Sequence, residues 1–224
     1  MESRLPPAQM SESFRIGALL ALAGGFFDVY TYLCRGGVFA NAQTGNMVLL
    51  GIALAGGDWA QALHYIFPIA AFALGVAAAE WVKLRYKDKT VRFHWRQLVV
   101  LAEILLVAAV AFMPQAANTF VNTIVSFICA LQVESFRKLR GSAFATTMCT
   151  GNLRSATEQF VRWHSDADVE ALAKARRYAA IIAWFIAGAA IGVLCARWLG
   201  GRAVLVTILA LAAVFVLMFR EKTA

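Results

Sequence analysis

The sequence contains little charge, proline or histidine for a chain of 224 residues. Charged side chains make up 15% of it and hydrophobic residues 61%, whereas a soluble domain is typically about 25% charged and about 45–50% apolar. This shortage excludes a disordered chain and disfavours a water-soluble enzyme. The three histidines are scattered and the four cysteines form no Cys-x-x-Cys pair. The sequence therefore predicts no disulfide framework, no metal site and no cofactor.

Recognisable catalytic motifs are missing as well. The chain has no Gly-x-Ser-x-Gly, no His-Glu-x-x-His and no paired-aspartate motif, which are patterns that place a nucleophile or a metal in an active site. We therefore expect that the protein is not an enzyme. An intramembrane enzyme with Asp28 and His64 as acid and base stays an alternative, although no pattern places these two side chains together.

Long apolar runs are what the chain does contain. A helix of about 20 apolar residues spans a bilayer, so the sequence predicts an all-α polytopic membrane protein. Residues 1–14 are polar and lack a basic segment or a cleavage site, which predicts a retained tail before a single transmembrane domain over 15–224. The predicted spans are roughly 15–34, 62–82, 98–114, 119–136, 177–199 and 203–219.

An internal repeat relates the two halves of the chain. The first copy reads Arg-Gly-x-x-Phe-Ala-x-x-x-Thr-Gly-Asn over 35–46, and the second has the same residues over 140–152 with one insertion. Further along, Phe72-x-x-Gly75 aligns with Phe185-x-x-Gly188. Fixed self-similarity of this kind indicates a duplicated unit, and we assign the repeats to 15–114 and 119–219.

The distribution of Lys and Arg favours six spans over eight. Segments 37–56 and 143–162, which carry the Thr-Gly-Asn motifs, are ambiguous as spans. If neither crosses, the halves form a 3+3 inverted repeat with 18 Lys and Arg inside and 3 outside. If both cross, a 4+4 parallel repeat leaves Arg154 inside a span and splits the other Lys and Arg residues only 12 to 8. Because cytoplasmic loops carry the excess of Lys and Arg, we predict six spans, with the Thr-Gly-Asn segments as re-entrant or broken elements.

The Thr-Gly-Asn segments are the predicted substrate-binding site. Threonine and asparagine are good helix N-caps and glycine tolerates positive φ, so each motif would present a positive helix end at mid-membrane. Repeat-built transporters bind solutes at such ends. A buried turn that only packs two helices together stays an alternative. The residues concerned are Thr44, Gly45, Asn46, Thr150, Gly151 and Asn152.

Three charged residues are further candidates. Asp28 and Glu134 lie within apolar runs, where carboxylates are functional candidates by default, and we predict them as proton- or ion-coupling sites. Glu134 could instead form an ordinary i,i+4 pair with Lys138. Arg154 follows the second motif, where it would neutralise an anionic solute or pair with Asp28 or Glu134.

Other features receive structural interpretations. Glu80 and Glu103 flank a basic loop, and we expect them to pair with nearby Lys or Arg residues. Gly188-x-x-x-Gly192 is a small-xxx-small pattern suited to close helix packing, either within the chain or in a homodimer. The net charge of +8 follows from the loop bias, so no nucleic-acid partner is predicted.

The motifs resemble those of the YoaK-like family, a bacterial membrane-protein family of unknown function. The resemblance rests on Gly-Gly-Phe-Phe-Asp over 24–28, on Gly37-x-Phe39, and on the two Thr-Gly-Asn segments, and it covers nearly the whole chain. It implies a protein of the bacterial plasma membrane with about six spans. We further expect both termini to be cytoplasmic.

Taken together, these patterns favour a small-solute transporter or channel, with proton coupling through the intramembrane carboxylates. Its expected partners are the lipid bilayer and an unidentified small solute bound between the two Thr-Gly-Asn elements. A non-transporting scaffold or regulatory subunit is the main alternative, and an intramembrane enzyme is the third.

Overall fold

The structure is a bundle of helices, as predicted. The computed structural model describes residues 13–86, 95–139, 142–143 and 149–219. Within these residues the regular secondary structure is helical except for one hairpin of two-residue strands, β1 (Lys138–Leu139) and β2 (Ser142–Ala143). The helices are α1 (Phe14–Cys34), α2 (Gln43–Ala55), α3 (Trp59–Tyr86), α4 (Trp95–Val110), η2 (Gln115–Ala117), α5 (Asn118–Ser135), α6 (Cys149–Asp166), α7 (Val169–Leu199), η3 (Gly200–Val206) and α8 (Thr207–Phe219).

Four helical stretches of the described chain are long and apolar enough to cross a membrane. They are Phe14–Cys34, Trp59–Tyr86, Gln115–Ser135 and Val169–Met218. The last stretch contains two of the six predicted runs, because the 3-10 turn η3 joins α7 to α8. Helix α4 has 16 residues and is about 24 Å long, which is short for a hydrocarbon core of about 30 Å. The molecule therefore has the helices of a membrane protein, with fewer full-length stretches than predicted.

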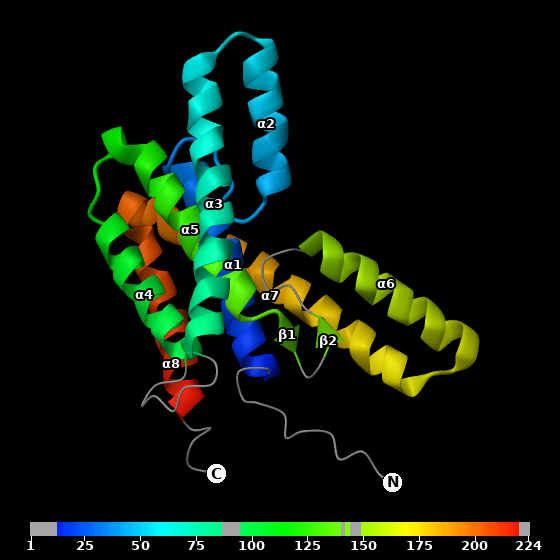
Figure 1. The fold of residues 1–224 in the computed structure, drawn as a ribbon. Coiled ribbons are helices and arrows are strands. Elements are labelled where there is room, and N and C mark those ends of the chain that lie inside the picture. Colours follow the sequence, from blue (N-terminus) through cyan, green and yellow to red (C-terminus); the bar gives the residue numbers. More distant parts are fainter. Residues whose placement is uncertain (1–12, 87–94, 140–141, 144–148, 220–224) are drawn as a thin grey trace.

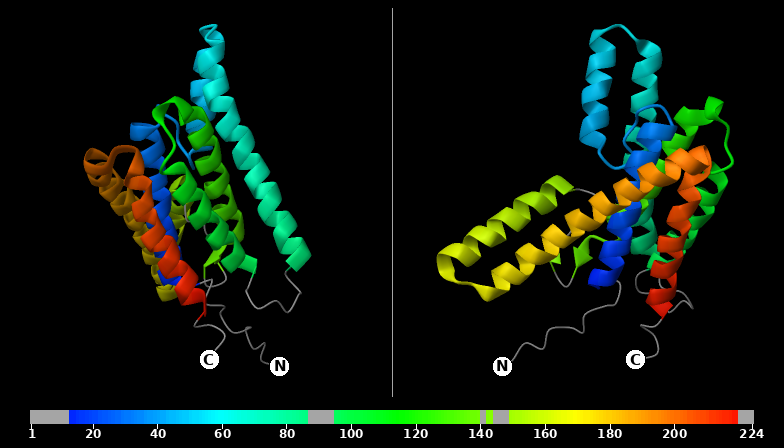
Figure 2. Two further views of the ribbon diagram at one scale, coloured as in Figure 1. Left: turned by 90° about the vertical axis from the view of Figure 1, so that its left-hand side faces the viewer. Right: turned by 180° about the vertical axis from the view of Figure 1, so that it is seen from behind.

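Two long helix pairs form the centre of the bundle. Helix α1 packs along α7, and α3 packs along α5. Helix α8 packs against both α1 and α4. Figures 1 and 2 show α2–α3 and α6–α7 as two hairpins that project from the bundle in different directions. The first turn of α1 and the last turn of α8 lie at the same end of the molecule (Figure 1).

Glycines let the helices of both central pairs approach closely. A Cβ atom at Gly188 of α7 would collide with the backbone of Leu22 in α1. A Cβ atom at Gly75 of α3 would lie 2.6 Å from the Cβ of Ala130 and 2.7 Å from the carbonyl oxygen of Phe127, both in α5. The predicted small-residue pattern that begins at Gly188 is therefore used within the chain.

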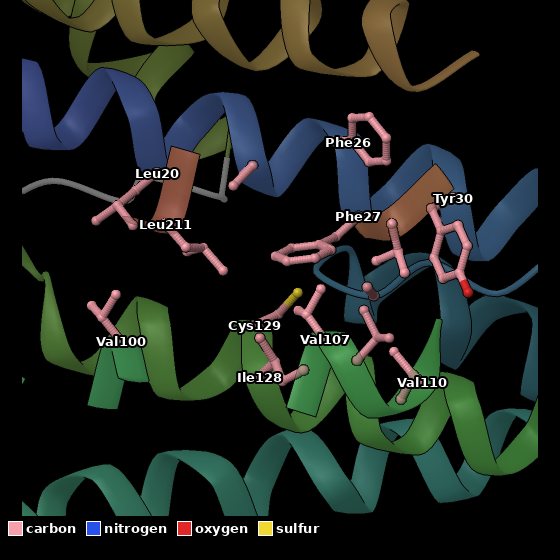
Figure 3. Packing of buried hydrophobic residues seen from close by; sticks show 14 of the residues in the cluster. Leu20, Phe26, Phe27, Tyr30, Val100, Val107, Val110, Ile128, Cys129 and Leu211 are labelled. Carbon is pink, nitrogen blue, oxygen red and sulfur yellow. The ribbon is translucent and has the colours of Figure 1, made fainter. Parts of the chain in front are cut away.

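Apolar side chains from α1, α4, α5 and α8 fill the interior, as Figure 3 shows. Phe27 of α1 lies close to the thiol of Cys129 in this view, and both residues are completely buried. Because interiors of this kind are close-packed, they fix the positions of the helices. Helix α1 is thus held rigidly at the centre, and it carries the first residue of the candidate site. The other labelled core residues are Leu20, Phe26, Tyr30, Val100, Val107, Val110, Ile128 and Leu211.

The outer surface of the long helices is apolar. Leu74 on α3 is 66% exposed and Trp198 on α7 is 87% exposed, and many other large apolar residues share this exposure. Apolar surface on this scale marks contact with lipid or protein. Helix α6 is the polar exception, and Glu158 and Arg162 form an exposed ion pair of 3.0 Å on it.

Candidate functional site

A cavity of about 860 Å³ lies where the first turns of α2 and α6 meet α1 and α7. Both Thr-Gly-Asn segments reach it: α2 contributes Thr44, and α6 contributes Thr150 and Gly151. Asp28 lines it from α1. The structure thus brings together, in one cavity, four of the residues that the sequence singles out from opposite halves of the chain.

Asp28 is held at the edge of this cavity by the segment that precedes α2. It lies six residues before the end of α1 and is 8% exposed. Its Oδ1 atom accepts a hydrogen bond of 2.7 Å from the backbone N–H of Asn41. The side chain of Asn41 in turn donates to the carbonyl oxygen of Gly24, at 3.0 Å. This chain of contacts fixes the carboxylate relative to the start of α2.

Aromatic side chains form much of the cavity wall. Tyr32 of α1 and Phe39 of the loop before α2 stack with ring centroids 4.8 Å apart and planes inclined by 21°. Phe72 of α3 and Phe185 of α7 line other parts of the wall. Sequence reasoning did not select these four residues for the site, although Phe39, Phe72 and Phe185 all lie within the repeated motifs.

The cavity carries one formal charge among the described residues that line it. Asp28 is acidic, and no Lys, Arg or His belongs to this lining. The remaining polar side chains are uncharged at neutral pH and include Gln43 and Thr44. The described wall is therefore apolar and aromatic, with a single anionic point and a few hydroxyl and amide groups near it.

Asn46 holds the loop before α2 rather than lining the cavity. Its Oδ1 atom accepts from the Phe39 N–H at 3.0 Å, and its Nδ2 group donates to the Phe39 carbonyl oxygen at 2.6 Å. Nδ2 also donates to the Gln43 side chain, at 2.9 Å. Asn46 is completely buried, and Asn152 in the second motif is only 2% exposed. Neither belongs to the cavity lining, so the geometry of Asn46 fits the alternative of a buried packing turn.

The predicted N-caps differ from the observed helix starts. Helix α2 begins at Gln43, and its N-cap is Ala42, which makes no side-chain capping bond. The first motif therefore lies inside the first turn of α2, and the second lies inside the first turn of α6. Gly45 and Gly151 keep negative φ angles. The prediction that threonine or asparagine caps each helix after a break at glycine is wrong for α2, because this helix already begins before the motif, at Gln43.

The two glycines of the motifs have different surroundings. A Cβ atom at Gly45 would lie 3.1 Å from the ring of Phe39, whereas a Cβ atom at Gly151 would meet nothing within 4 Å. Gly151 lines the cavity and Gly45 does not. The glycine of the first motif is thus packed against its own loop, and the glycine of the second opens onto the cavity.

Arg154 and Glu134 both lie away from the cavity lining. Arg154 is exposed on α6 and forms no ion pair with Asp28 or Glu134, although the sequence allowed either pairing. Glu134 pairs with Arg137 at 3.0 Å, with the two side chains 9% and 64% exposed. The side chain of Lys138, its predicted partner, lies outside the described residues.

The expectations for Glu80 and Glu103 have opposite outcomes. Glu80 pairs with Lys83 at 2.7 Å, as predicted. Glu103 is completely buried on α4, and neither of its carboxyl oxygens has a hydrogen-bond partner among the described residues. The prediction of an interfacial pair is therefore wrong for Glu103. The sequence shows Glu103 only as an acid inside an apolar run. Whether its side chain faces the interior or the membrane interface depends on how α4 packs in the bundle.

Arg35, the first residue of the repeated motif, has a structural task that the sequence did not reveal. It is completely buried, and its guanidinium donates to backbone carbonyl oxygens in η3, at the last residue of α4 and in the loop that follows α4, at 3.1–3.5 Å. Its Nε also donates to the Tyr30 hydroxyl, at 2.8 Å. Carbonyl groups at a helix C-terminus carry partial negative charge, so they compensate this cation.

His64 lies away from Asp28 and contacts other groups. Its ring nitrogens lie 2.8 Å from the Thr119 hydroxyl and 3.1 Å from the Gly36 carbonyl oxygen. It does not belong to the cavity lining. This geometry links α3, α5 and the loop after α1, and it does not pair His64 with Asp28.

Comparison with known proteins identifies the family. A family model described as "Protein of unknown function (DUF1275)" matches residues 16–217, so the chain belongs to that family. The match agrees with the family resemblance that the motifs indicate. Neither the curated proteins nor the solved structures contain a significant match to the chain.

Proposed function

We propose that this member of the family moves a small solute across the membrane, as a transporter or channel, and holds it in the cavity between α2 and α6. One observation carries the proposal: a single cavity is lined by the first turns of both Thr-Gly-Asn helices and by the carboxylate of Asp28. Discontinuous helices that meet near a central site are the arrangement used by repeat-built transporters. No catalytic step and no cofactor form part of the proposal.

We infer that the two halves, α1–α4 and α5–α8, form an inverted repeat. If α1 corresponds to α5 and α3 to α7, the packing of α1 on α7 corresponds to the packing of α5 on α3, and both are present. The aligned glycines Gly188 and Gly75 support this, because each lets one of these pairs approach closely. In Figure 1, α1 and α5 run in opposite directions along the bundle.

The Thr-Gly-Asn helices are best explained as elements that do not cross the membrane. Helix α2 has 13 residues, about 20 Å at 1.5 Å per residue, whereas the hydrocarbon core is about 30 Å thick. Helix α6 carries Arg154, Glu158 and Arg162, and one charge at the bilayer centre costs about 2.5–3.5 kcal/mol on insertion scales. These lengths and charges support the six-span 3+3 arrangement.

The positions of the first and last described helices support the prediction that both termini lie on the same side of the membrane. The first turn of α1 and the last turn of α8 lie at the same end of the bundle (Figure 1). The bias of Lys and Arg supports a cytoplasmic location for that end, and the family resemblance supports a bacterial plasma membrane. Of the two carboxylates predicted for coupling, we retain Asp28, since Glu134 is paired outside the cavity lining.

Cysteine accessibility tests whether the cavity is a solute pathway. Thr44→Cys and Thr150→Cys are made singly in a chain whose four native cysteines are replaced, and each is treated in cells with a membrane-impermeant maleimide. Because both positions are exposed and line the cavity, we expect both to react, since a solute site must open to water.

Two control positions define the scale of reactivity. Leu74→Cys lies 66% exposed on α3, facing lipid, and should stay unreactive. Asp58→Cys lies exposed between α2 and α3 and should react from the outer side. If Thr44→Cys and Thr150→Cys stay as silent as Leu74→Cys in folded protein, both in cells and in inside-out membrane vesicles, the cavity is closed to water from both sides and the proposed function is wrong.

A further inference from the structure

We propose that the cavity takes an organic cation with an apolar body, such as a substituted ammonium ion carrying an aromatic or branched group. This assignment rests on the proposed solute-carrying function and deepens it by naming the class of solute. It follows from three properties of the described lining: its charge, its aromatic wall and its size.

The charge of the described lining selects a cation. Asp28 is the one charged side chain that lines the cavity in the described chain, and no Lys, Arg or His offsets it there. No ion pair joins Asp28 to a described cation. Attraction between opposite charges grows as the local dielectric constant falls, so a cationic solute would gain more here than at an exposed carboxylate.

The positive helix ends near the cavity do not change the preference for a cation. The first turn of a helix carries about half a positive charge, which would favour an anion. At α2 this end already faces the Asp28 carboxylate, which accepts the N–H of Asn41 just before the helix. At α6 the half charge is smaller than the full negative charge of Asp28. The side chains at these ends, Thr44 and Thr150, are neutral.

The aromatic wall selects an organic cation. Ammonium groups with apolar substituents are attracted to the faces of aromatic rings within about 6 Å. Tyr32 and Phe39 present a stacked pair in the wall, and Phe72 and Phe185 add rings from α3 and α7. An apolar solute body would contact these rings while its charged group faces Asp28.

Size and ligand chemistry disfavour a bare metal ion. The described residues contain no group of three or more His, Cys, Asp and Glu side chains that could hold a metal ion. The cavity volume of about 860 Å³ lies in the range of about 300–1,000 Å³ that is typical of sites for organic ligands.

A matched pair of probes tests the assignment. Benzyltrimethylammonium and benzylsulfonate share a phenyl ring and a tetrahedral charged head and differ in the sign of the charge. Binding of each to the purified full-length protein is measured by isothermal titration calorimetry at neutral pH. We expect the cation to bind at least tenfold more tightly than the anion, and Asp28→Asn to weaken cation binding at least tenfold. The control Asp166→Asn removes an exposed acid at the end of α6 and should leave binding unchanged.

Two further variants keep the test decisive if Asp28→Asn does not fold. Asp28→Glu preserves the charge and should retain the preference for the cation. Phe72→Leu removes a ring while keeping an apolar wall, and it should weaken the cation several-fold. Equal or tighter binding of benzylsulfonate, unchanged cation binding in folded Asp28→Asn, or no saturable cation binding by folded wild-type protein would each overturn the assignment.

The failure of this assignment can be told apart from failure of the proposed function. Reactive cysteines at Thr44 and Thr150 together with a preference for the anion would leave the solute pathway in place and reject the cation. Silent cysteines at both positions would reject the pathway itself, whichever probe binds.

Discussion

Replacing Asn46 by alanine should destabilise the protein rather than remove a solute ligand. The substitution deletes the acceptor for the Phe39 N–H at 3.0 Å and the donor to the Phe39 carbonyl oxygen at 2.6 Å. A hydrogen bond contributes about 1 kcal/mol net, and a buried group left without a partner costs about 1–3 kcal/mol. Because Asn46 is completely buried, water would replace the lost groups poorly. We therefore expect a loss of about 2–4 kcal/mol.

Thermal unfolding in detergent, followed by tryptophan fluorescence, measures this loss. For a chain of this size 1 kcal/mol corresponds to about 2–4 °C in Tm, so Asn46→Ala should lower Tm by about 5–15 °C. The matched control is Thr44→Ala, two positions earlier in the same turn. Thr44 is exposed and lines the cavity, and a substitution at such a position typically changes stability by less than about 0.5 kcal/mol.

The two variants should separate stability from binding. Asn46→Ala is expected to lower Tm, and Thr44→Ala is expected to keep Tm and to change the affinity for benzyltrimethylammonium. If Asn46→Ala keeps the wild-type Tm and abolishes binding of the probe, the asparagine contacts the solute, and its hydrogen bonds to Phe39 do not stabilise the fold.

Three further predictions concern the packing of the bundle. Gly75→Ala should lower the free energy of unfolding by about 1–3 kcal/mol, because its Cβ would lie 2.6 Å from another Cβ and 2.7 Å from a backbone oxygen. The control Gly51→Ala, whose Cβ meets open space, should instead raise the free energy of unfolding by up to about 1 kcal/mol. Equal effects of the two variants in thermal unfolding would contradict the close approach of α3 and α5. Glu103→Leu should raise Tm, because it removes a completely buried carboxyl without a described hydrogen-bond partner, and such burial costs about 1–3 kcal/mol. A lower Tm would show that this carboxyl is hydrogen-bonded. Arg35→Met should cost about 3–5 kcal/mol, since it leaves several backbone carbonyl oxygens without their donor and each buried polar group left unsatisfied costs about 1–3 kcal/mol. A change below about 1 kcal/mol in the same assay would refute that role.

The sequence was sufficient to predict the class of the fold and four residues that line the cavity. Apolar runs predicted helices because a bilayer demands length and hydropathy together, and those signals are local. Asp28 was predicted because an acid inside an apolar run is conspicuous, and the structure places it at the cavity together with Thr44, Thr150 and Gly151.

The aromatic wall and the task of Asn46 could not be read from the sequence. In an apolar helix, a phenylalanine that lines a cavity and one that faces lipid have the same local signature. Asn46 fitted both a ligand and a buried turn, and only the position of Phe39 in space distinguishes the two. Arg154 lies outside the cavity lining because α6 turns it outward, and this orientation depends on where the helix begins, which the sequence does not reveal.

Solute efflux from proteoliposomes tests the central claim most directly. Vesicles are loaded with a mixture of small organic solutes of all charges, and mass spectrometry follows which ones leave faster than from empty vesicles. Gly151→Trp fills the cavity, since a side chain there points into open space, and Gly51→Trp adds the same bulk on α2 outside the cavity lining. We predict that at least one solute leaves through wild-type protein and Gly51→Trp but not through folded Gly151→Trp. Efflux that is identical with and without the protein, or that is unchanged by Gly151→Trp, would contradict the cavity as the path of a solute.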